Sequence, residues 1–393
     1  MNNKNKHIFE NHTKEQVNFP DNITIETITN LKEFKTFYKI PFNIYNKNPY
    51  WVPPFWTELN EFFKNKNPFW SHSKCKLFTA KKNSKYIGRI VAIIDDKYYE
   101  KFNKKIGLFG FFECINDYGC AEALFQSAQK WLVLKNMDII RGPINGRIDV
   151  GCGFLANNYD SIPSLLCSYS PEYYISFMEK FNMKKIREFN SYKIDLSKPF
   201  PAKIKEESQK CIESGIRIRK LNRLRTQKEL KWWTKLVLET YVDHWGYVSV
   251  TEEEVKSRFG VKQLRWFVDP KLFLIAEYEN TPVGYIWSTP DYNQIFKTMN
   301  GRLGILQMLT FLLKQKQIKI GKLQFIGVKK EFRDKNIGSC LNYKTLVEMK
   351  KRGFISAVVG LIDKKNEVPN ATIVKTGAKP YKRYLVYEKK INN

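Results

Sequence analysis

The chain has 393 residues, of which 43% are hydrophobic and 15% are aromatic. This composition excludes an intrinsically disordered chain, and the length predicts two or three domains. Lys+Arg 67 against Asp+Glu 39 leaves a net charge of +28. Such an excess favours a polyanionic partner, namely a nucleic acid, an anionic membrane or a phosphorylated cofactor, although its even spread along the chain also fits a compositional bias.

The cysteine and hydropathy patterns argue against a metalloprotein, a disulfide-rich secreted protein and a membrane-spanning protein. Seven scattered cysteines form no CxxC pair and histidine is scarce, so we predict no metal site, no disulfide framework and a reducing cytoplasm. The polar start MNNKNKHIFENHTKEQ lacks an apolar signal core. The longest apolar stretch, residues 303–313, is too short for a bilayer span of about 20 residues. We therefore expect a cytoplasmic protein that is at most peripheral at the inner membrane face.

Hydrophobic periodicity predicts the same order of elements in each half of the chain. Strands are predicted at residues 23–28, 76–80, 86–94, 106–112, 138–141, 165–168 and 185–194, and then at 216–220, 272–279, 283–288, 322–328, 355–361 and 381–388. Helices are predicted at residues 31–44, 55–63, 121–134 and 172–181, and then at 226–241, 252–267, 303–316, 338–351 and 369–376.

This repeated order predicts two copies of one α/β (α+β) fold. The polar, proline-punctuated segment SKPFPAKIKEESQK places the boundary between them. We predict a flexible tail over residues 1–20, a first domain over 21–196, a linker over 197–214 and a second domain over 215–393.

The second domain contains a strand-to-helix turn suited to anions. The strand KLQFIGV is interrupted by Gly327, which indicates a bulge or a close backbone approach. A helix start near Gly338 offers backbone N–H groups and a favourable dipole to phosphate, and Arg333 and Lys335 add positive charge. On these features alone, an ordinary structural turn is the favoured interpretation.

The segment GVKKEFRDKNIGSCL resembles the cofactor motif of the GNAT superfamily of CoA-dependent N-acyltransferases. The motif Arg/Gln-x-x-Gly-x-Gly/Ala falls on Arg333, Asn336 and Gly338, and Asn336 replaces its first glycine. Asparagine tolerates a positive φ better than most residues, so the turn can survive. The resemblance continues through LIDKKNEVPNATIVKTGAKPYKRYLVYEKK and covers most of residues 215–393. It implies tandem GNAT-like domains, each a mixed, mostly antiparallel sheet flanked by helices.

The resemblance also implies acyl-CoA as co-substrate, an amine as acceptor and a set of binding residues. Backbone groups of Ile326, Gly327 and Val328 would pair with the pantetheine arm, and Asn366 would lie along the cofactor. Ile373 stands where the family often has the tyrosine that protonates the leaving thiolate, so Tyr381 and Tyr384 are the nearest candidates, or the thiolate leaves unassisted. Backbone amides at the turn would hold the pyrophosphate, and these belong to Arg333, Asp334, Lys335, Asn336, Ile337, Gly338 and Ser339.

The first half lacks this motif. Glu113 and Asp117 stand where phosphates would bind, and their charges would repel a pyrophosphate. We therefore interpret the first domain as GNAT-like without CoA binding. The whole pattern is similar to bacterial tandem GNAT-like proteins of unknown or lipid-related activity.

Two segments are candidates for the acceptor site, the first because the resemblance to GNAT proteins implies an acceptor cleft beside the segment that joins the first two helices of the second domain. In ETYVDHWGYVSVTEEE, the residues Asp243 and His244 could deprotonate an amine beside Trp245; alternatively, the histidine simply packs against Trp245, or Glu239 is the base. In RGPINGRIDVGCGFL, the four glycines indicate close backbone approach. This loop either lines a substrate channel through Asn145, Arg147 and Asp149 or is a tight structural crossover.

The apolar segment 303–313 is followed by Lys314, Lys316 and Lys319. It is either a buried helix or the wall of an acyl-chain tunnel or membrane-facing lid, with the lysines on anionic headgroups. The second interpretation favours a long-chain donor and a lipid-like amine. Two other functions stay open: an aminoacyl or peptide transferase of the cell-wall type, and a non-catalytic regulatory protein that binds nucleic acid, a partner that we do not otherwise expect.

Overall fold

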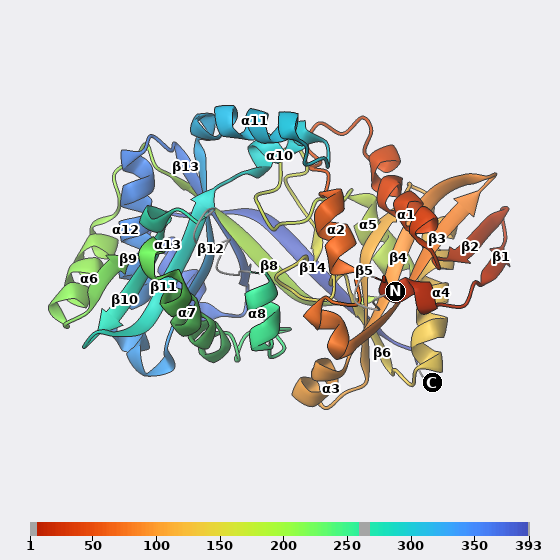
Figure 1. Ribbon diagram of the computed structural model, residues 1–393, viewed down its shortest axis with the longest axis horizontal. Helices are drawn as coiled ribbons and strands as arrows, with labels where there is room; N and C mark the ends of the chain where they lie inside the picture. Colours follow the sequence, from red (N-terminus) through yellow and green to blue (C-terminus); the bar gives the residue numbers. More distant parts are fainter. Residues whose placement is uncertain (1–5, 259–267, 392–393) are drawn as a thin grey trace. The chain divides into compact units, whose positions relative to one another are not determined.

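The computed structural model describes residues 6–258 and 268–391, which form two compact units (Figure 1). Unit 1 comprises Met1–Glu188, Phe296–Met308 and Tyr384–Asn393, and unit 2 comprises Phe189–Ile295 and Leu309–Arg383. Each unit contains a mixed, mostly antiparallel sheet with flanking helices, as the sequence predicted.

The sheet of unit 1 has the order β1-β2-β3-β4-β5-β6-β14, with β7 paired to β14. Neighbouring strands are antiparallel except for β5 and β6, which are parallel. The strands are β1 Gln16–Phe19, β2 Ile23–Thr27, β3 Ser73–Lys82, β4 Lys85–Asp95, β5 Ile106–Cys114, β6 Ile139–Gly142, β7 Phe154–Leu155 and β14 Lys379–Lys390. The helices are α1 Leu31–Ile44, α2 Trp56–Phe62, α3 Asp96–Phe102, α4 Tyr118–Leu134 and α5 Tyr173–Lys180.

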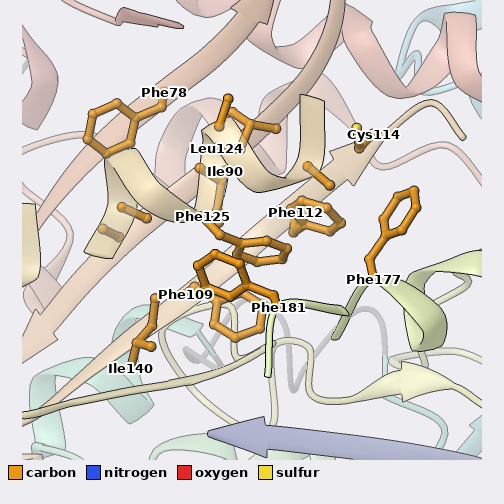
Figure 2. Packing of buried hydrophobic residues seen from close by; sticks show 14 of the residues in the cluster. Phe78, Ile90, Phe109, Phe112, Cys114, Leu124, Phe125, Ile140, Phe177 and Phe181 are labelled. Atoms are coloured by element: carbon orange, nitrogen blue, oxygen red, sulfur yellow. The ribbon is translucent and has the colours of Figure 1, made fainter. Parts of the chain in front are cut away.

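Aromatic side chains fill the space between this sheet and α4 (Figure 2). The ring of Phe125 on α4 stacks on Phe112 of β5 at 4.7 Å and contacts Phe109 at 5.4 Å. Phe181, directly after α5, contacts Phe125 at 5.0 Å. Because such aromatic pairs add to the hydrophobic gain of burial, this cluster fixes α4 and α5 against β5.

The N-terminal segment differs from the predicted flexible tail. A short 3₁₀ helix, η2 (Ile8–Asn11), precedes β1, and the backbone N–H of Ile8 donates to the carbonyl of Phe63. Phe9 is fully buried, with its ring 4.6 Å from that of Phe34 on α1. Burial of this aromatic side chain offsets the entropy lost on ordering the segment.

A charged pair lies inside unit 1. Arg89 of β4 and Glu113 of β5 are opposite each other in the ladder, and the Arg89 guanidinium lies 4.7 Å above the ring of Phe37. The hydroxyls of Tyr45 and Tyr174 donate to Glu113 Oε2 at 2.6 and 3.0 Å. Burial raises the pKa of Glu113 to about 7, and the Arg89 charge and the two tyrosine hydroxyls offset part of that rise.

The sheet of unit 2 has the order β8-β13-β12-β11-β10-β9, in which only β12 and β13 are parallel. The strands are β8 Lys184–Asp195, β9 Arg217–Lys220, β10 Phe273–Tyr278, β11 Thr281–Pro290, β12 Ile320–Val328 and β13 Ser356–Asp363. The helices are α6 Ala202–Glu213, α7 Thr226–Thr240, α8 Glu252–Arg258, α12 Ile337–Lys351 and α13 Glu367–Val374. The part of the predicted helix 252–267 that follows Arg258 lies outside the described residues.

Helices α7 and α12 cover opposite faces of this sheet (Figure 1). Successive residues of a strand face opposite sides, and Tyr285 of β11 contacts the ring of Trp233 on α7. The preceding residue, Gly284, approaches Ile337 of α12 instead. Strand β11 therefore has α7 on one face and α12 on the other.

Several predicted boundaries differ from the structure. The predicted linker 197–214 contains α6, whose Ile204 and Cys211 are buried in unit 2, and the predicted strand 165–168 is a turn. The units also exchange segments in a way that periodicity cannot reveal, since Tyr384–Asn393 belongs to unit 1.

The predicted apolar helix is present but not buried. Helices α10 (Asn293–Met299) and α11 (Ile305–Lys314) connect β11 to β12, and no residue of α11 is buried. The buried-helix interpretation is therefore wrong. None of the helices in residues 6–258 and 268–391 has both the length and the hydrophobicity needed to cross a membrane.

We expect the stability of unit 1 to depend on pH through Glu113. Its folded pKa, about 7, exceeds the ordinary value of 4.5, so the folded state holds the proton more tightly. The free energy of unfolding should then fall by roughly 3 kcal/mol as pH rises from 4.5 to above 7. Urea unfolding of the wild type and Glu113→Gln across this range measures the effect, which the variant should lack. Parallel pH profiles would contradict the assignment.

Candidate active site

Strand β12 separates from β13 halfway along its length. The two strands pair from Ile320↔Ser356 to Leu323↔Val359, whereas pairing with β11 on the other side continues to Val328. A register shift against β11 leaves Gln324 as an extra residue, and such a bulge bends the strand. Among the described residues, no strand continues the β13-side ladder beside Ile326, Gly327 and Val328. This edge offers backbone groups to an extended ligand.

The end of α7 lies against the same part of β12. The hydroxyl of Tyr241 donates to the carbonyl of Ile326 at 3.1 Å. A Cβ atom at Gly327 would lie 2.5 Å from Thr240 Oγ1 and 2.7 Å from the ring of Tyr285. The glycine therefore permits the close approach that the sequence indicated, while the bulge itself lies at Gln324.

The three candidates near the predicted acceptor site lie just after α7. The ring of His244 stacks on Tyr241, with centroids 4.8 Å apart, and so lies next to the side chain that contacts β12. Trp245 contacts Phe189 of β8 instead, at 5.8 Å, and Asp243 is exposed. His244 is thus linked to β12 by its stacking on Tyr241, whose hydroxyl bonds to Ile326, whereas Asp243 is exposed.

The turn after β12 leads into an uncapped helix. Asn336 has φ 55 and ψ 20, the left-handed conformation that its residue type allowed, and it precedes α12 without a side-chain cap. The first hydrogen bond of the helix runs from the Cys340 N–H to the Asn336 carbonyl. The amides of the first turn, at Ile337, Gly338 and Ser339, precede the first hydrogen bond of the helix and are the groups that an anion could accept from.

Side chains around this turn have separate roles. Arg333 is exposed, while the Lys335 ammonium lies 5.5 Å above the ring of Tyr278. The Ser339 hydroxyl donates to Glu207 Oε2 at 2.6 Å, so only its backbone amide is available for a ligand. A Cβ atom at Gly338 would contact only Thr372 Cγ2, at 3.7 Å, which leaves room beside the turn.

Helix α13 lies next to the start of α12. Asn366 is its N-cap residue and accepts from the Asn370 side chain at 2.6 Å through its carbonyl. The Tyr192 hydroxyl of β8 donates to Asn370 Oδ1 at 2.6 Å. Ile373 is buried in the core of unit 2 beside Ile337, so this position supplies packing and no acid.

The two tyrosines proposed as acids lie on β14. The ring of Tyr381 faces the ammonium groups of Lys193 and Lys382 at 5.5 and 5.3 Å. Tyr384 is fully buried and pairs with Leu155 of β7, within unit 1. The two side chains therefore belong to different units.

Unit 1 contains a similar strand separation that its own side chains fill. Strand β5 pairs with β4 as far as Cys114 but with β6 only over Ile106–Leu108. Asn145 Oδ1 accepts from the N–H of Phe111 at 2.7 Å, and the Tyr174 hydroxyl accepts from the N–H of Cys114 at 2.7 Å. These amides are therefore not available to a cofactor.

The glycine-rich loop and the start of α4 are also engaged within unit 1. Arg147 and Asp149, the other predicted substrate contacts, form an ion pair at 3.1 Å. Asp117 caps α4 by accepting from the N–H of Cys120, and its carboxylate pairs with Lys82 at 2.8 Å. A helix start that holds its own carboxylate disfavours a second anion.

The separated strands and the uncapped helix start lie next to each other in unit 2 and together form a candidate site for an extended ligand that carries an anionic group. Sequence comparison agrees, because the acetyltransferase (GNAT) family model matches residues 235–368. This match lies mainly in unit 2, and the fold of the whole chain is similar to that of tandem GNAT proteins.

Relatives and solved structures extend along the chain. It is 28% identical to protein YghO of Escherichia coli over 93% of this chain and 95% of that protein. It is 26% identical to the bacterial ceramide synthase of Caulobacter vibrioides over 91% and 94%. A tandem GNAT protein from the clavulanic acid biosynthesis pathway aligns with TM-score 0.55 and 10% identity, covering 94% of this chain and 99% of that one.

The sequence reasoning missed two residues that shape this site. The Lys322 ammonium, from a buried side chain, donates to the Gly360 carbonyl at 3.0 Å, close to where β12 and β13 separate. Tyr241 reaches β12 across 85 positions of sequence. A lysine inside an apolar strand was a usable signal for the first, whereas the second required the tertiary structure.

The left-handed turn can be tested at Asn336. Asn336→Gly should leave the free energy of unfolding within about 0.5 kcal/mol, because glycine adopts this conformation readily. Asn336→Val should lower it by about 1–3 kcal/mol, because a β-branched residue is strained at positive φ. Denaturant unfolding of both variants measures the difference; equal stabilities would contradict the assigned conformation.

Proposed function

We propose that this protein is an N-acyltransferase that transfers an acyl group from acyl-CoA to the amine of a lipid-like acceptor. One observation carries the proposal: in unit 2 the open edge of β12 leads directly to the uncapped start of α12. An extended pantetheine arm needs the first feature, and a pyrophosphate needs the second.

The residues of unit 2 fit this co-substrate. Backbone groups of Ile326, Gly327 and Val328 would hold the pantetheine arm, and the amides at the start of α12 would hold the pyrophosphate, with Arg333 as an exposed counter-charge. Asn366, at the start of α13, would lie along the cofactor. The space beside Gly338 is consistent with a phosphate there.

Acyl-CoA supplies the activated thioester, and the chain must orient it and manage protons. Backbone N–H groups of β12 would stabilise negative charge that develops on the acyl oxygen. The amine must lose a proton, and we assign this step to His244, directly or through water, because its ring stacks on Tyr241. Glu239 is less suited, because its carboxylate pairs with Lys329 at 3.3 Å.

We assign the proton donor for the leaving thiolate to Tyr241. Its hydroxyl is 3.1 Å from the backbone of β12 at Ile326, whereas Ile373 has no proton to give and Tyr384 is buried within unit 1. Tyr381 stays an alternative donor. Asp243 and Trp245 would border the acceptor.

The name of one relative favours a lipid-like acceptor and a long-chain donor. A ceramide is an N-acylated long-chain amino alcohol, and the bacterial ceramide synthase matches this chain over most of both lengths. At 26% identity the substrate of that relative is a starting hypothesis, and the acyl-chain length and the exact amine are the quantities to measure.

Cofactor binding can be tested at Gly338. Gly338→Glu should abolish CoA binding by calorimetry, because the carboxylate would repel the pyrophosphate. Gly338→Ala is the matched control and should bind within a few-fold of wild type, because its Cβ contacts only Thr372. Both variants should keep the wild-type far-UV circular dichroism. Unchanged affinity in Gly338→Glu would place the pyrophosphate elsewhere.

Acyl transfer can be tested by thiol release from acetyl-, octanoyl- and palmitoyl-CoA with a long-chain amino alcohol, glucosamine or an amino acid as acceptor. We expect the fastest turnover with palmitoyl-CoA and the amino alcohol, and mass spectrometry should detect the amide. Turnover of acetyl-CoA alone would contradict the long-chain proposal, and no turnover of any pair would contradict the enzyme.

The same assay distinguishes the proton donors. Tyr241→Phe should lower kcat by about tenfold or more while leaving the Kd for CoA unchanged, because it removes one hydroxyl and keeps the ring. Tyr381→Phe is the comparison. An unchanged kcat in the first variant together with a loss in the second would assign the proton to Tyr381.

A further inference from the structure

Helix α11 exposes its apolar side chains. Ile305 is 83% exposed and Leu313 is 77% exposed, and Leu309 and Leu312 are each more than half exposed. At 100° per residue these four side chains lie on one face, with Met308 at its margin. Scattered exposed leucines are common, but a continuous face of this kind usually marks a binding surface.

The opposite face of α11 is turned toward the protein and combines polar side chains with one aromatic ring. Gln307 and Thr310 are partly buried, and the ring of Phe311 lies 5.2 Å from that of Tyr292. A surface helix normally buries its apolar face and exposes its polar one. In α11 most of the aliphatic side chains are exposed instead, which costs hydrophobic stabilisation in water unless another apolar phase covers them.

The surrounding sequence is uniformly basic. From Tyr292 to Lys330 the chain contains no aspartate or glutamate. Three lysines, at 314, 316 and 319, follow the helix and are exposed, and the exposed Arg302 precedes it. The apolar face is therefore bordered at both ends by positive charge without any nearby acid in the sequence.

We propose that α11 docks the protein onto an anionic lipid bilayer. Its aliphatic face would enter the boundary between headgroups and acyl chains, and Arg302 and the three lysines would contact lipid phosphates. At ten residues the helix is about 15 Å long, so it would lie in the membrane plane and not cross it.

The composition favours a bilayer over a second protein chain. Protein interfaces are enriched in aromatic residues and depleted in lysine, whereas this surface combines aliphatic side chains with lysines. The inference does not depend on acyl transfer, since vesicle binding can be measured without CoA or an acceptor.

Co-sedimentation of the full chain with vesicles tests the proposal. Vesicles of phosphatidylcholine with 30% phosphatidylglycerol should bind the wild type, more weakly at 0.5 M than at 0.1 M salt, and pure phosphatidylcholine should bind it far less. The double variant Leu309→Gln/Leu313→Gln should bind about tenfold or more weakly. Lys314→Gln/Lys316→Gln should lose most of the dependence on phosphatidylglycerol.

Leu224→Gln is the matched control, because Leu224 is 92% exposed and lies outside this surface. It should bind as wild type does. The α11 variants should keep the wild-type melting temperature and the wild-type affinity for CoA, which separates this test from that of the proposed function. In hydrogen exchange, vesicles should protect the amides of residues 303–315.

Two outcomes would overturn the proposal. One is equal sedimentation of the wild type and the leucine double variant with anionic vesicles. The other is no vesicle binding by the wild type together with a dimer that the double variant dissociates, which would assign the face to a second copy of the chain.

Discussion

The separation of β12 from β13 after Leu323 is the constraint on which the candidate site of unit 2 depends. Backbone N–H and C=O groups that leave a sheet need other partners, because leaving them unsatisfied is costly. On the β11 side the ladder continues to Val328, so the strand stays fixed while its other edge opens. The bulge at Gln324 bends the strand, and Gly327 has no side chain that would clash with Thr240.

Unit 1 shows that the strand separation alone does not make a cofactor site. There, Asn145 and Tyr174 bond to the amides that the bend exposes, and Asp117 occupies the helix start. In unit 2, by contrast, Asn336 adopts the left-handed conformation and gives no side-chain cap. Both units therefore have a separated strand followed by a helix start. In unit 1 polar side chains occupy the exposed backbone amides, whereas in unit 2 the helix start has no side-chain cap.

The sequence predicted what depends on short-range patterns. Alternation located β2 and helical spacing located α1, and the residue type of Asn336 anticipated its positive φ. The binding turn was placed through its resemblance to a family motif. Prediction failed where contacts between distant residues determine the structure. The segment around Phe9 is ordered because Phe9 packs on Phe34. Helix α6 is stabilised by the buried residues Ile204 and Cys211, although its charged neighbours gave the segment the composition of a linker.

Site details that join remote segments could not be predicted for the same reason. The bond from Tyr241 to Ile326 and the stacking of His244 on Tyr241 arise because α7 ends against β12. Nothing in the local pattern around position 241 indicates which strand it meets. The exposure of the α11 leucines is similar, because an apolar helix has the same sequence whether its leucines face the core or the outside.

The last ten residues of the chain have a consequence for its synthesis. Tyr384–Asn393 belongs to unit 1, where the end of β14 pairs with β6 and β7. Domains generally fold as units, starting with the N-terminal one while the chain is still on the ribosome. Here the N-terminal unit lacks a strand until the residues that follow Arg383 have been made, so its sheet edge at β6 stays open while unit 2 is being made. The unit that is synthesised first is thus completed last.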